Sequence, residues 1–298
     1  MSAPELSVCI VTYRAKDLLR DCLQSLCENT HLPFEVIVVD NGSQDGVKSM
    51  LESEFPAFSV IENDENLGFT YPMNQALRLA QGRYLLQLNP DTLILPGSLD
   101  NMVAFMNAHP DIGICGPRVL NRNRTLQKSC RRGEPTPWAV LTYFLGLSAR
   151  YPKSKLFGQY QMNYMDENLT HPVGGVSGSC MLIRRELIDD IGYLDERFFA
   201  YQEDADFCLR ARQAGWQVYY YPGAEIIHYG GRGGSRVEPY RSIMAWHKSY
   251  FLYYRKHLAK NYFFLFNWFY YLAMILKLCL SLVVNFIRKE KIVSARRP

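Results

Sequence analysis

Short apolar runs alternate with segments of helical periodicity through the first 120 residues of the chain. Period-two or continuous apolar runs predict strands, at residues 7–13, 34–40, 58–63, 83–89 and 112–119. Apolar positions three and four apart predict helices between them, at residues 17–29, about 46–53, about 71–80 and 98–110. Apolar strands between amphipathic helices are typical of a mostly parallel sheet covered on both faces. We therefore expect an α/β, Rossmann-type architecture.

The pattern is less regular in the second half. Residues 120–170 predict a long irregular connection rich in Arg, Pro, Tyr and Asn. A strand is expected at 179–185, a short helix at about 186–191, and a longer helix that begins near Asp204 and stops at Gly215. Residues 216–231 predict a pair of strands around Pro222-Gly223.

Composition and charge divide the chain into two parts. At 298 residues, 48% hydrophobic and 21% charged, it is a folded protein. The net charge of +4 hides a strong asymmetry, because residues 248–298 hold ten Lys/Arg and one Asp/Glu, against 23 and 28 in residues 1–247. A basic tail of this kind suits an anionic surface, either a membrane or a nucleic acid.

The compartment follows from the cysteines and the N-terminus. The eight cysteines form no CxxC pair, and several lie inside apolar runs. The first residues lack the basic and apolar regions of a secretory signal. These features predict a reduced, cytoplasmic catalytic body.

Residues 262–287 are long and apolar enough to span a bilayer, with 22 apolar residues of 26. Their few polar residues, however, form one narrow stripe on a helix, and basic residues flank both ends. This pattern favours a helix that lies in the interface at the cytoplasmic face over one that spans. Burial against another subunit of an oligomer is a third interpretation. We expect a catalytic domain at 1–235 and a basic, aromatic helical region at 236–298.

Polar residues end three of the predicted parallel strands. These are Thr12 and Tyr13, then Asp40, then Asn89-Pro90-Asp91. Asp and Asn beside Gly also form ordinary turns, but carboxyl ends of parallel strands lie at one edge, where ligands bind. Asp40 can accept a hydrogen bond from a pyrimidine imide, and a second carboxylate can hold a divalent cation against a diphosphate. No GxGxxG follows the first strand, which excludes a dinucleotide-binding Rossmann site.

An ordered set of motifs resembles the inverting family 2 glycosyltransferases, and most of all bacterial rhamnosyltransferases that extend cell-surface polysaccharides. The motifs cover about residues 6–257 and read, in order, VCIVTYR, VIVVDNGSQDG, NDENLGFTYPMNQAL, YLLQLNPDT, SGSCMLIRREL, GYLDERFFAYQEDADFCLRARQAGW and HYGGRGGS. The resemblance implies a GT-A fold, a nucleotide-diphosphate sugar as donor, and Mg²⁺ or Mn²⁺ as cofactor.

The resemblance also assigns residues to the donor. It makes Thr12, Tyr13 and Asp40 nucleoside contacts. It makes Asp91 the carboxylate that bridges to the metal, as the last residue of a variant Asp-x-Asp motif that begins here at Asn89. Oxygen ligands with a single carboxylate suit Mg²⁺ or Mn²⁺, with phosphate oxygens and water completing the shell.

Further positions match motifs near the metal and the donor. His228 matches a family histidine beside the metal or diphosphate, although a lone histidine is often structural. Asn66, Gly68 and Asn74 match the NxGF(x)₄N motif near the donor. The chain departs from the family at residues 70–73, which read Thr-Tyr-Pro-Met where the family often has glycines. The departure leaves the fine shape of the donor pocket open.

Three carboxylates, Glu203, Asp204 and Asp206, begin a predicted helix. Acidic residues favour the first turn through the helix dipole. Inverting transfer, however, needs a carboxylate to take the acceptor's hydroxyl proton, and crowding of negative charge would raise one pKa toward that role. The family's Glu-Asp pair places the base at Asp204, with Glu203 as the alternative.

Two basic or glycine-rich segments allow more than one interpretation. The stretch from Arg118 to Arg132 suits either a phosphate clamp or a solvated loop. GGRGGS at 230–235 lacks a P-loop lysine and predicts a flexible lid.

Together these features predict a metal-dependent glycosyltransferase attached to the cytoplasmic face of a membrane. It would transfer a sugar, plausibly rhamnose from dTDP-rhamnose, to a glycan or lipid-linked glycan, with no nucleic-acid partner. One alternative is a sugar-phosphate nucleotidyltransferase, which usually has a glycine-rich loop after the first strand that is absent here. The other is an inactive, membrane-recruited nucleotide-sugar-binding protein.

Overall fold

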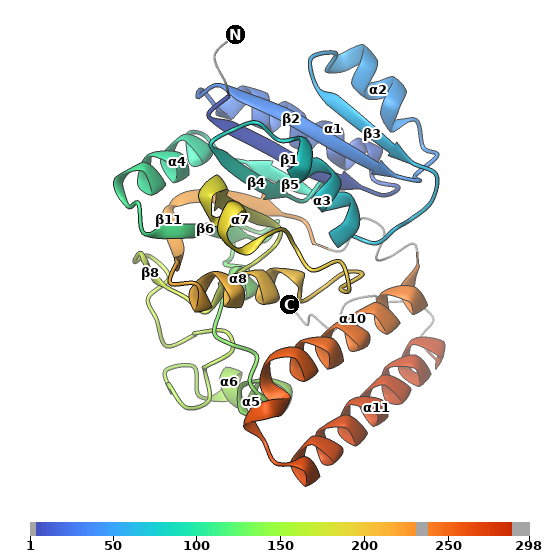
Figure 1. Cartoon of the computed structure of the whole chain (residues 1–298), viewed down its shortest axis with the longest axis vertical. Helices are drawn as coiled ribbons and strands as arrows, with labels where there is room; N and C mark the ends of the chain where they lie inside the picture. The colour runs from blue at the N-terminus through green and yellow to red at the C-terminus, as the bar shows by residue number, and fades with distance from the viewer. Residues whose placement is uncertain (1–3, 231–237, 288–298) are drawn as a thin grey trace.

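A nine-stranded, mostly parallel sheet forms the centre of the computed structural model, which describes residues 4–230 and 238–287 (Figure 1). The strands run in the order β3-β2-β1-β4-β10-β6-β11-β5, and β8 pairs with β11. A separate ribbon joins β7 to β9. Their bounds are β1 Leu6–Thr12, β2 Phe34–Asn41, β3 Ser59–Asn63, β4 Tyr84–Leu88, β5 Thr92–Ile94, β6 Ile112–Leu120, β7 Arg131–Arg132, β8 His171–Pro172, β9 Gly175–Val176, β10 Cys180–Arg184 and β11 Gln217–His228.

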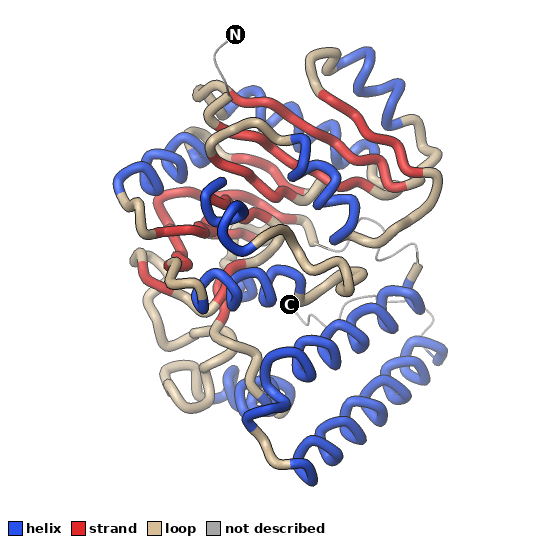
Figure 2. Tube along the Cα trace, in the orientation of Figure 1, coloured by secondary structure: helices blue, strands red, loops and turns tan. Residues whose placement is uncertain are grey.

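Helices cover both faces of this sheet, with α3 and α7 in front of it and α1 behind it (Figures 1 and 2). Helix α1 shows why, because its buried residues Leu19, Cys22, Leu23 and Leu26 recur at helical spacing on one face. The helices have the bounds α1 Lys16–Asn29, α2 Val47–Glu54, α3 Thr70–Leu79, α4 Ser98–Ala108, α5 Pro137–Phe144, α6 Leu147–Arg150, α7 Arg185–Ile191, α8 Glu203–Gln213, α10 Pro239–Tyr253 and α11 Phe264–Ile287. The predicted α/β class is confirmed.

The register of the parallel strands places the candidate residues at one edge. Thr12 at the end of β1 lies opposite Asp40 at the end of β2. Strand β4 pairs with the other side of β1 and ends one residue before Asn89. The carboxyl ends of β1, β2 and β4 therefore meet, as their parallel arrangement requires.

Two sequence predictions need correction. Residues 217–228 form one strand, β11, and not a pair. A register shift between Tyr221 and Glu225 shows that Pro222-Gly223 makes a bulge within a strand that continues along β6. Residues 120–170 are also more ordered than predicted, because they contain β7, α5, α6 and a 3₁₀ turn, Lys128–Cys130.

The C-terminal region forms a helical hairpin in which α10 and α11 lie side by side (Figures 1 and 2). A π-helical turn, Tyr254–Leu258, and a 3₁₀ turn, Ala259–Asn261, connect the two helices. This hairpin packs against the sheet domain through a second apolar cluster, formed by Phe198, Ala205, Leu209, Tyr253, Tyr254 and Leu258. Helix α8, which carries the acidic cluster, is thus held between the sheet and the C-terminal hairpin.

Buried ion pairs reinforce this contact. The fully buried carboxylate of Asp206 accepts hydrogen bonds from Lys256 Nζ at 2.5 Å, His257 Nε2 at 2.7 Å and Arg210 Nε at 2.9 Å. Lys256 also reaches Asp195 at 2.7 Å. Burial alone would raise the pKa of Asp206, but the hydrogen bonds from His257 and Lys256 and the nearby positive charges lower it overall.

This shift predicts how stability depends on pH. A carboxylate with a lowered pKa in the folded state stabilises the protein above its unfolded pKa of about 3.9, and this contribution is lost as the pH falls below that value. We expect the free energy of unfolding to fall between about pH 5 and pH 3, and to fall less steeply in Asp206→Asn. Denaturant unfolding followed by fluorescence at several pH values measures both slopes. Equal slopes would show that Asp206 does not titrate with unfolding.

Candidate active site

The donor end of the site lies where β1 and β2 end. Thr12 is fully buried, and its Oγ1 has no hydrogen-bond partner among the described residues. Opposite it, Asp40 Oδ1 accepts a hydrogen bond from Ser43 N at 3.1 Å. Burial raises the pKa of Asp40 despite this bond. A buried hydroxyl without a partner beside a buried carboxyl group is an arrangement that a polar ligand can satisfy.

Glu238, directly before α10, closes this end of the site. It accepts a hydrogen bond from Tyr13 Oη at 2.9 Å and lies 3.4 Å from Asn66 Nδ2. Arg241, one helical turn later, pairs with Glu238 at 3.1 Å and donates to Asn66 O at 2.8 Å. Tyr13 and Asn66, predicted to contact the donor, are thus brought together by a residue that sequence reasoning missed.

Gly68 allows a close approach of two segments. Its φ is +90°, and a Cβ at this position would lie 2.3 Å from Phe199 O. Asn66 Oδ1 accepts from Gly68 N at 3.0 Å, and Asn41 Nδ2 donates to Gly68 O at 2.6 Å. No side chain fits here, which explains the glycine of this motif.

Asn74 makes different contacts from the other predicted donor residues. Its Nδ2 donates to Leu194 O and to Glu196 Oε1, both at 2.9 Å, and its Oδ1 accepts from Leu194 N at 3.2 Å. The side chain is 1% exposed. In this structure Asn74 therefore fastens α3 to the segment before α8.

Asp91 and His228 meet at the ends of β4 and β11. His228 Nε2 lies 3.1 Å from Asp91 Oδ1 and 3.3 Å from Asn89 Nδ2, and both Asp91 and His228 are 5% exposed. On the other side of the ring, Nδ1 lies 2.8 Å from Gln127 Oε1, whose own amide group donates to Asn121 Oδ1 at 3.2 Å. Gln127 Oε1 can only accept, so Nδ1 donates to it and this bond fixes the orientation of the ring, with Nε2 facing Asp91.

This arrangement fits a divalent cation. A carboxylate oxygen and an imidazole nitrogen converge, and both groups are common ligands of divalent cations. The described residues hold no group of three or more His, Cys, Asp or Glu, so further ligands must come from elsewhere. Mg²⁺ typically uses one or two protein carboxylates together with substrate phosphates and water, which matches this incomplete set.

Asp204, the second residue of α8, lies near the Asn89 end of the site. Its Oδ2 accepts from Arg132 Nη2 at 2.5 Å and from Gly178 N at 2.8 Å, and its Oδ1 accepts from Ala205 N at 2.7 Å. One residue further on, Ser179 O accepts from Asn89 N at 3.0 Å. The predicted base and the predicted metal-binding segment therefore border the same short loop.

The predicted crowding of negative charge in the acidic cluster is wrong, because separate cations neutralise its aspartates. Arg132 pairs with Asp204, whereas Asp206 turns to Arg210, Lys256 and His257. The pKa of Asp206 is consequently lowered and not raised. These cations orient the two carboxylates of α8 in different directions. Asp204 faces the candidate site, and Asp206 binds the C-terminal hairpin.

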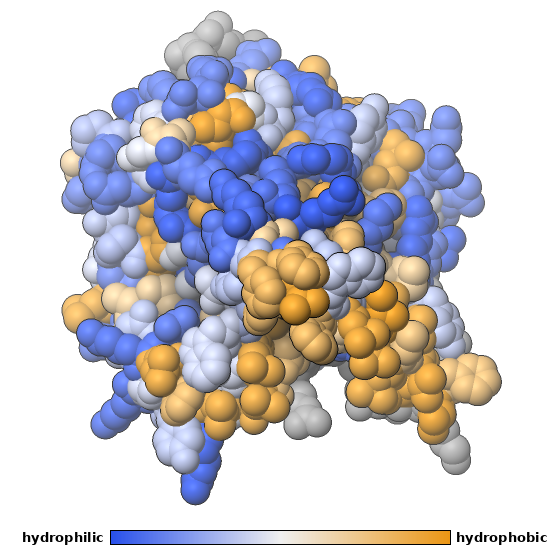
Figure 3. Space-filling model, turned by 60° about the horizontal axis from the view of Figure 1, so that its bottom comes forward, coloured by the Kyte–Doolittle hydropathy of each residue, from blue (hydrophilic) through white to orange (hydrophobic). Residues whose placement is uncertain are grey.

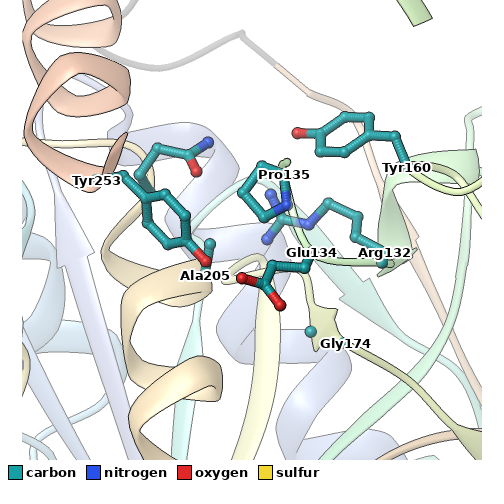
Figure 4. Close-up of a pocket in the computed structure, with 10 residues that line it drawn as sticks. Arg132, Glu134, Pro135, Tyr160, Gly174, Ala205 and Tyr253 are labelled. Atoms are coloured by element: carbon teal, nitrogen blue, oxygen red, sulfur yellow. The ribbon is translucent and has the colours of Figure 1, made fainter. Parts of the chain in front are cut away.

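A small pocket lies beside the Arg132-Asp204 pair (Figure 4). Tyr253 and Tyr160 lie on opposite sides of it, with Arg132, Glu134 and Pro135 between them (Figure 4). Ala205 of α8 also lines it. Gln202, directly before α8, lines the pocket too, so the pocket lies at the first turn of this helix.

Sequence reasoning missed three residues of this site. Arg132 was included in a basic stretch suited to a phosphate clamp or a solvated loop, but it is buried against Asp204. Gln127 lies in a segment with no clear pattern. Glu238 lies 225 positions after Tyr13, so only the fold brings the two residues together. The Glu-Pro start of a helix at 238–239 was the available signal. The predicted lid at 230–235 falls almost entirely on residues 231–237, outside the described part of the chain.

Comparison with known proteins finds relatives of similar sequence and of similar fold. The chain is 29% identical over 259 residues to the N-acetylglucosaminyl-diphospho-decaprenol L-rhamnosyltransferase of Mycobacterium tuberculosis, covering 83% of each chain. It resembles the mannosyltransferase PcManGT from Pyrobaculum calidifontis, solved with GDP-Man and Mn²⁺, with a TM-score of 0.57 and 20% identity over 86% of this chain. It also resembles S. aureus TarS 1-349 in complex with UDP-GlcNAc, with a TM-score of 0.52 and 19% identity over 81% of this chain.

The extent of these matches decides what they show. The chain spans 65% of each of the two solved chains, and at these identities they establish the GT-A-like fold alone. The family match shows more than the fold, because residues 7–192, well over half of the chain, match Glycosyl transferase family 2. These residues include the strand ends at Thr12, Asp40 and Asp91. The chain therefore belongs to glycosyl transferase family 2.

Proposed function

We propose that this protein is a metal-dependent, inverting glycosyltransferase that transfers rhamnose from dTDP-rhamnose to a lipid-linked glycan at the cytoplasmic face of a membrane. The observation that carries the proposal is the edge of the sheet at which the Thr12-Asp40 and Asp91-His228 pairs lie, with Asp204 of α8 bound to the loop beside it. A glycosyl transfer needs a place for the nucleoside, one for the diphosphate and one for the acceptor hydroxyl, in that order.

The donor would bind along the first two pairs. Thr12 and Asp40 would hold the base and ribose, and Tyr13 and Asn66 would follow once Glu238 yields its hydrogen bonds to the ligand. Asp91 and His228 would hold Mg²⁺ or Mn²⁺, which neutralises the charge of the departing nucleoside diphosphate. The Mn²⁺ named for the mannosyltransferase of similar fold supports this cofactor class without distinguishing the two ions.

Asp204 would accept the proton of the acceptor hydroxyl. A carboxylate offers about four lone pairs, and contacts within the described part of the chain use two on Oδ2 of Asp204 and one on Oδ1. Arg132 and Gly178 thus fix the carboxylate while Oδ1 retains a lone pair for a substrate. A base on the acceptor side and a diphosphate on the donor side suit attack from opposite the leaving group, which inverts the anomeric centre.

The membrane part of the proposal rests on α11. It is 24 residues long and apolar enough to cross a membrane by length and composition, and 11% of an 18-residue apolar stretch within it is buried. Its polar residues contact the protein, since Asn267 donates to Ala259 O at 3.1 Å and Lys277 lies 3.7 Å from the Trp246 ring centre. A spanning orientation would separate these contacts, whereas a helix lying in the interface keeps them and immerses only its outer apolar face.

Donor profiling tests the assignment of substrate class. We expect a nucleotide-diphosphate sugar, with dTDP-rhamnose foremost, to raise the melting temperature in the presence of Mn²⁺ or Mg²⁺. A ligand at about 100 times its Kd adds about 2.7 kcal/mol of stability, which corresponds to a shift of several degrees or less for a chain of this size. Free rhamnose is the control and should give no shift. Stabilisation by a nucleoside triphosphate and a sugar 1-phosphate, but by no nucleotide sugar, would favour the nucleotidyltransferase alternative.

A further inference from the structure

The outward face of α5 and of the loop after it is apolar. Six exposed side chains form what we call the α5 patch, namely Trp138, Leu141, Phe144, Leu145, Tyr151 and Leu156. Positions between them on the helix, Ala139, Val140 and Thr142, are buried. The helix thus directs apolar residues both into the protein and away from it, and a contiguous exposed apolar surface marks an interaction site.

The charge around the α5 patch has one sign. Residues 135–165 contain three basic residues, Arg150, Lys153 and Lys155, and no Asp or Glu. All three basic side chains belong to exposed residues. Apolar side chains bordered by basic residues suit the interface of an anionic bilayer. The basic side chains contact the anionic headgroups, and the apolar side chains insert between them.

The α5 patch is continuous with the C-terminal hairpin. Phe144 packs edge-on against Trp246 of α10, with ring centres 6.2 Å apart, and Lys277 of α11 lies over both rings. Val140, Tyr250 and Met274 form a small apolar cluster that joins α5, α10 and α11. A face of the molecule that includes its lower end gathers hydrophobic side chains in its lower half, whereas hydrophilic ones predominate above (Figure 3).

The same segment leads to the candidate base. Arg132, which pairs with Asp204, lies five residues before α5, and Thr136 caps α5 by accepting from Ala139 N at 3.3 Å. Tyr160, after the loop, lines the pocket beside Arg132 and bonds to Tyr250 of α10 at 2.8 Å. A surface that binds the α5 patch would therefore also fix the position of Arg132 and of the pocket beside it relative to that surface.

We infer that the α5 patch is a second membrane-binding surface, which enters an anionic lipid bilayer together with α11. The inference rests on the proposed membrane association of α11 and adds a specific role. Contact through α11 alone would leave the catalytic body free to tilt about one helix axis. Contact at two places fixes the orientation of the body and turns the pocket beside Arg132 toward lipid-linked acceptors.

Fluorescence quenching by brominated lipid tests the contact directly. Trp268→Phe removes the exposed tryptophan of α11, and Trp268→Phe/Trp138→Phe removes that of the α5 patch as well. On vesicles that contain phosphatidylglycerol and brominated phosphatidylcholine, we expect the single variant to lose more of its fluorescence than the double variant. Equal fractional quenching of the two, with wild type bound and quenched through Trp268, would overturn the inference and leave the membrane role of α11 intact.

Vesicle partitioning gives a second measurement with a matched control. Leu141→Ser/Leu145→Ser should weaken binding to phosphatidylglycerol vesicles about tenfold, because both leucines lose their transfer into the bilayer. Leu79→Ser/Leu169→Ser changes two leucines of similar exposure elsewhere and should leave binding unchanged. Replacing Arg150, Lys153 and Lys155 by Gln should lower the partition coefficient about fivefold for each residue replaced, but only on anionic vesicles.

Other results would contradict the inference in distinct ways. If wild type binds to none of the vesicles, both the inference and the membrane part of the proposed function fail. Donor binding would still test the assignment as a glycosyltransferase. If Leu141→Ser/Leu145→Ser converts a dimer into a monomer during sedimentation, and Trp138 is not quenched by lipid, the α5 patch binds a second copy of the chain instead.

Discussion

Replacing Asp204 with Asn is expected to lower sugar transfer by about a hundredfold or more while donor affinity stays within a few fold. The variant keeps the shape of the side chain but removes the group that takes the acceptor's proton, and general bases typically contribute 10² to 10⁴ in rate. Donor affinity should persist because Thr12, Asp40 and Asp91 lie at the ends of β1, β2 and β4, whereas Asp204 lies on α8. Transfer rates and calorimetric titration of donor, made on the same preparation, separate the two effects.

The Arg132 pair calls for a second variant. Asp204→Asn leaves the buried Arg132 guanidinium without its carboxylate, and an unpaired buried charge is strongly destabilising. Asp204→Asn/Arg132→Met removes both charges, so it should recover stability without recovering transfer. Recovery of transfer in this double variant would mean that Asp204 acts only by neutralising Arg132. Loss of transfer in Glu203→Gln, with Asp204→Asn active, would move the base to Glu203.

Replacing Asp91 with Asn is expected to abolish the metal-dependent part of donor binding. The variant removes the only anionic oxygen of the Asp91-His228 pair, and an amide oxygen cannot hold Mg²⁺ or Mn²⁺ against a diphosphate with similar strength. Calorimetric titration of donor in Mn²⁺ and in EDTA measures how far the metal raises donor affinity in wild type and in the variant.

An exposed aspartate provides the matched control for this change. Asp189→Asn on α7 removes the same charge at an exposed position and should retain the full response to Mn²⁺. Wild-type binding that is equally tight in Mn²⁺ and in EDTA would refute the metal assignment. Retained metal dependence in Asp91→Asn would place the metal elsewhere.

The sequence predicted the parts of this protein that depend on local pattern. Apolar runs such as residues 34–40 can bury both faces only inside a covered sheet, so β1 to β4 and the helices between them followed from periodicity. The strand ends at Thr12, Asp40 and Asp91 then had to meet, because parallel strands share an edge. These steps need only neighbours in the chain and the topology of a parallel sheet.

Contacts between distant segments could not be predicted in this way. The Arg132-Asp204, Tyr13-Glu238 and Gln127-His228 contacts each join residues 70 or more positions apart. No local periodicity encodes such a pair. In the sequence, Arg132 cannot be told from an exposed arginine, because its partner Asp204 lies 72 positions away. The outward apolar face of α5 was hidden for a related reason, since helical spacing alone does not tell which face meets the protein.

Transfer of label from a nucleotide sugar to a lipid-linked acceptor tests the central claim most directly. The measurement incubates the full chain with Mn²⁺, dTDP-rhamnose labelled in the sugar, and a lipid-linked glycan in anionic vesicles. The first acceptor to use is N-acetylglucosaminyl-diphospho-decaprenol, which the name of the mycobacterial relative contains. We expect label to move into the lipid fraction, with the anomeric configuration of the new bond opposite to that of the donor, and EDTA to prevent this. Retention of the donor configuration, or donor that binds at the site yet never transfers its sugar to a lipid-linked acceptor, would contradict the account.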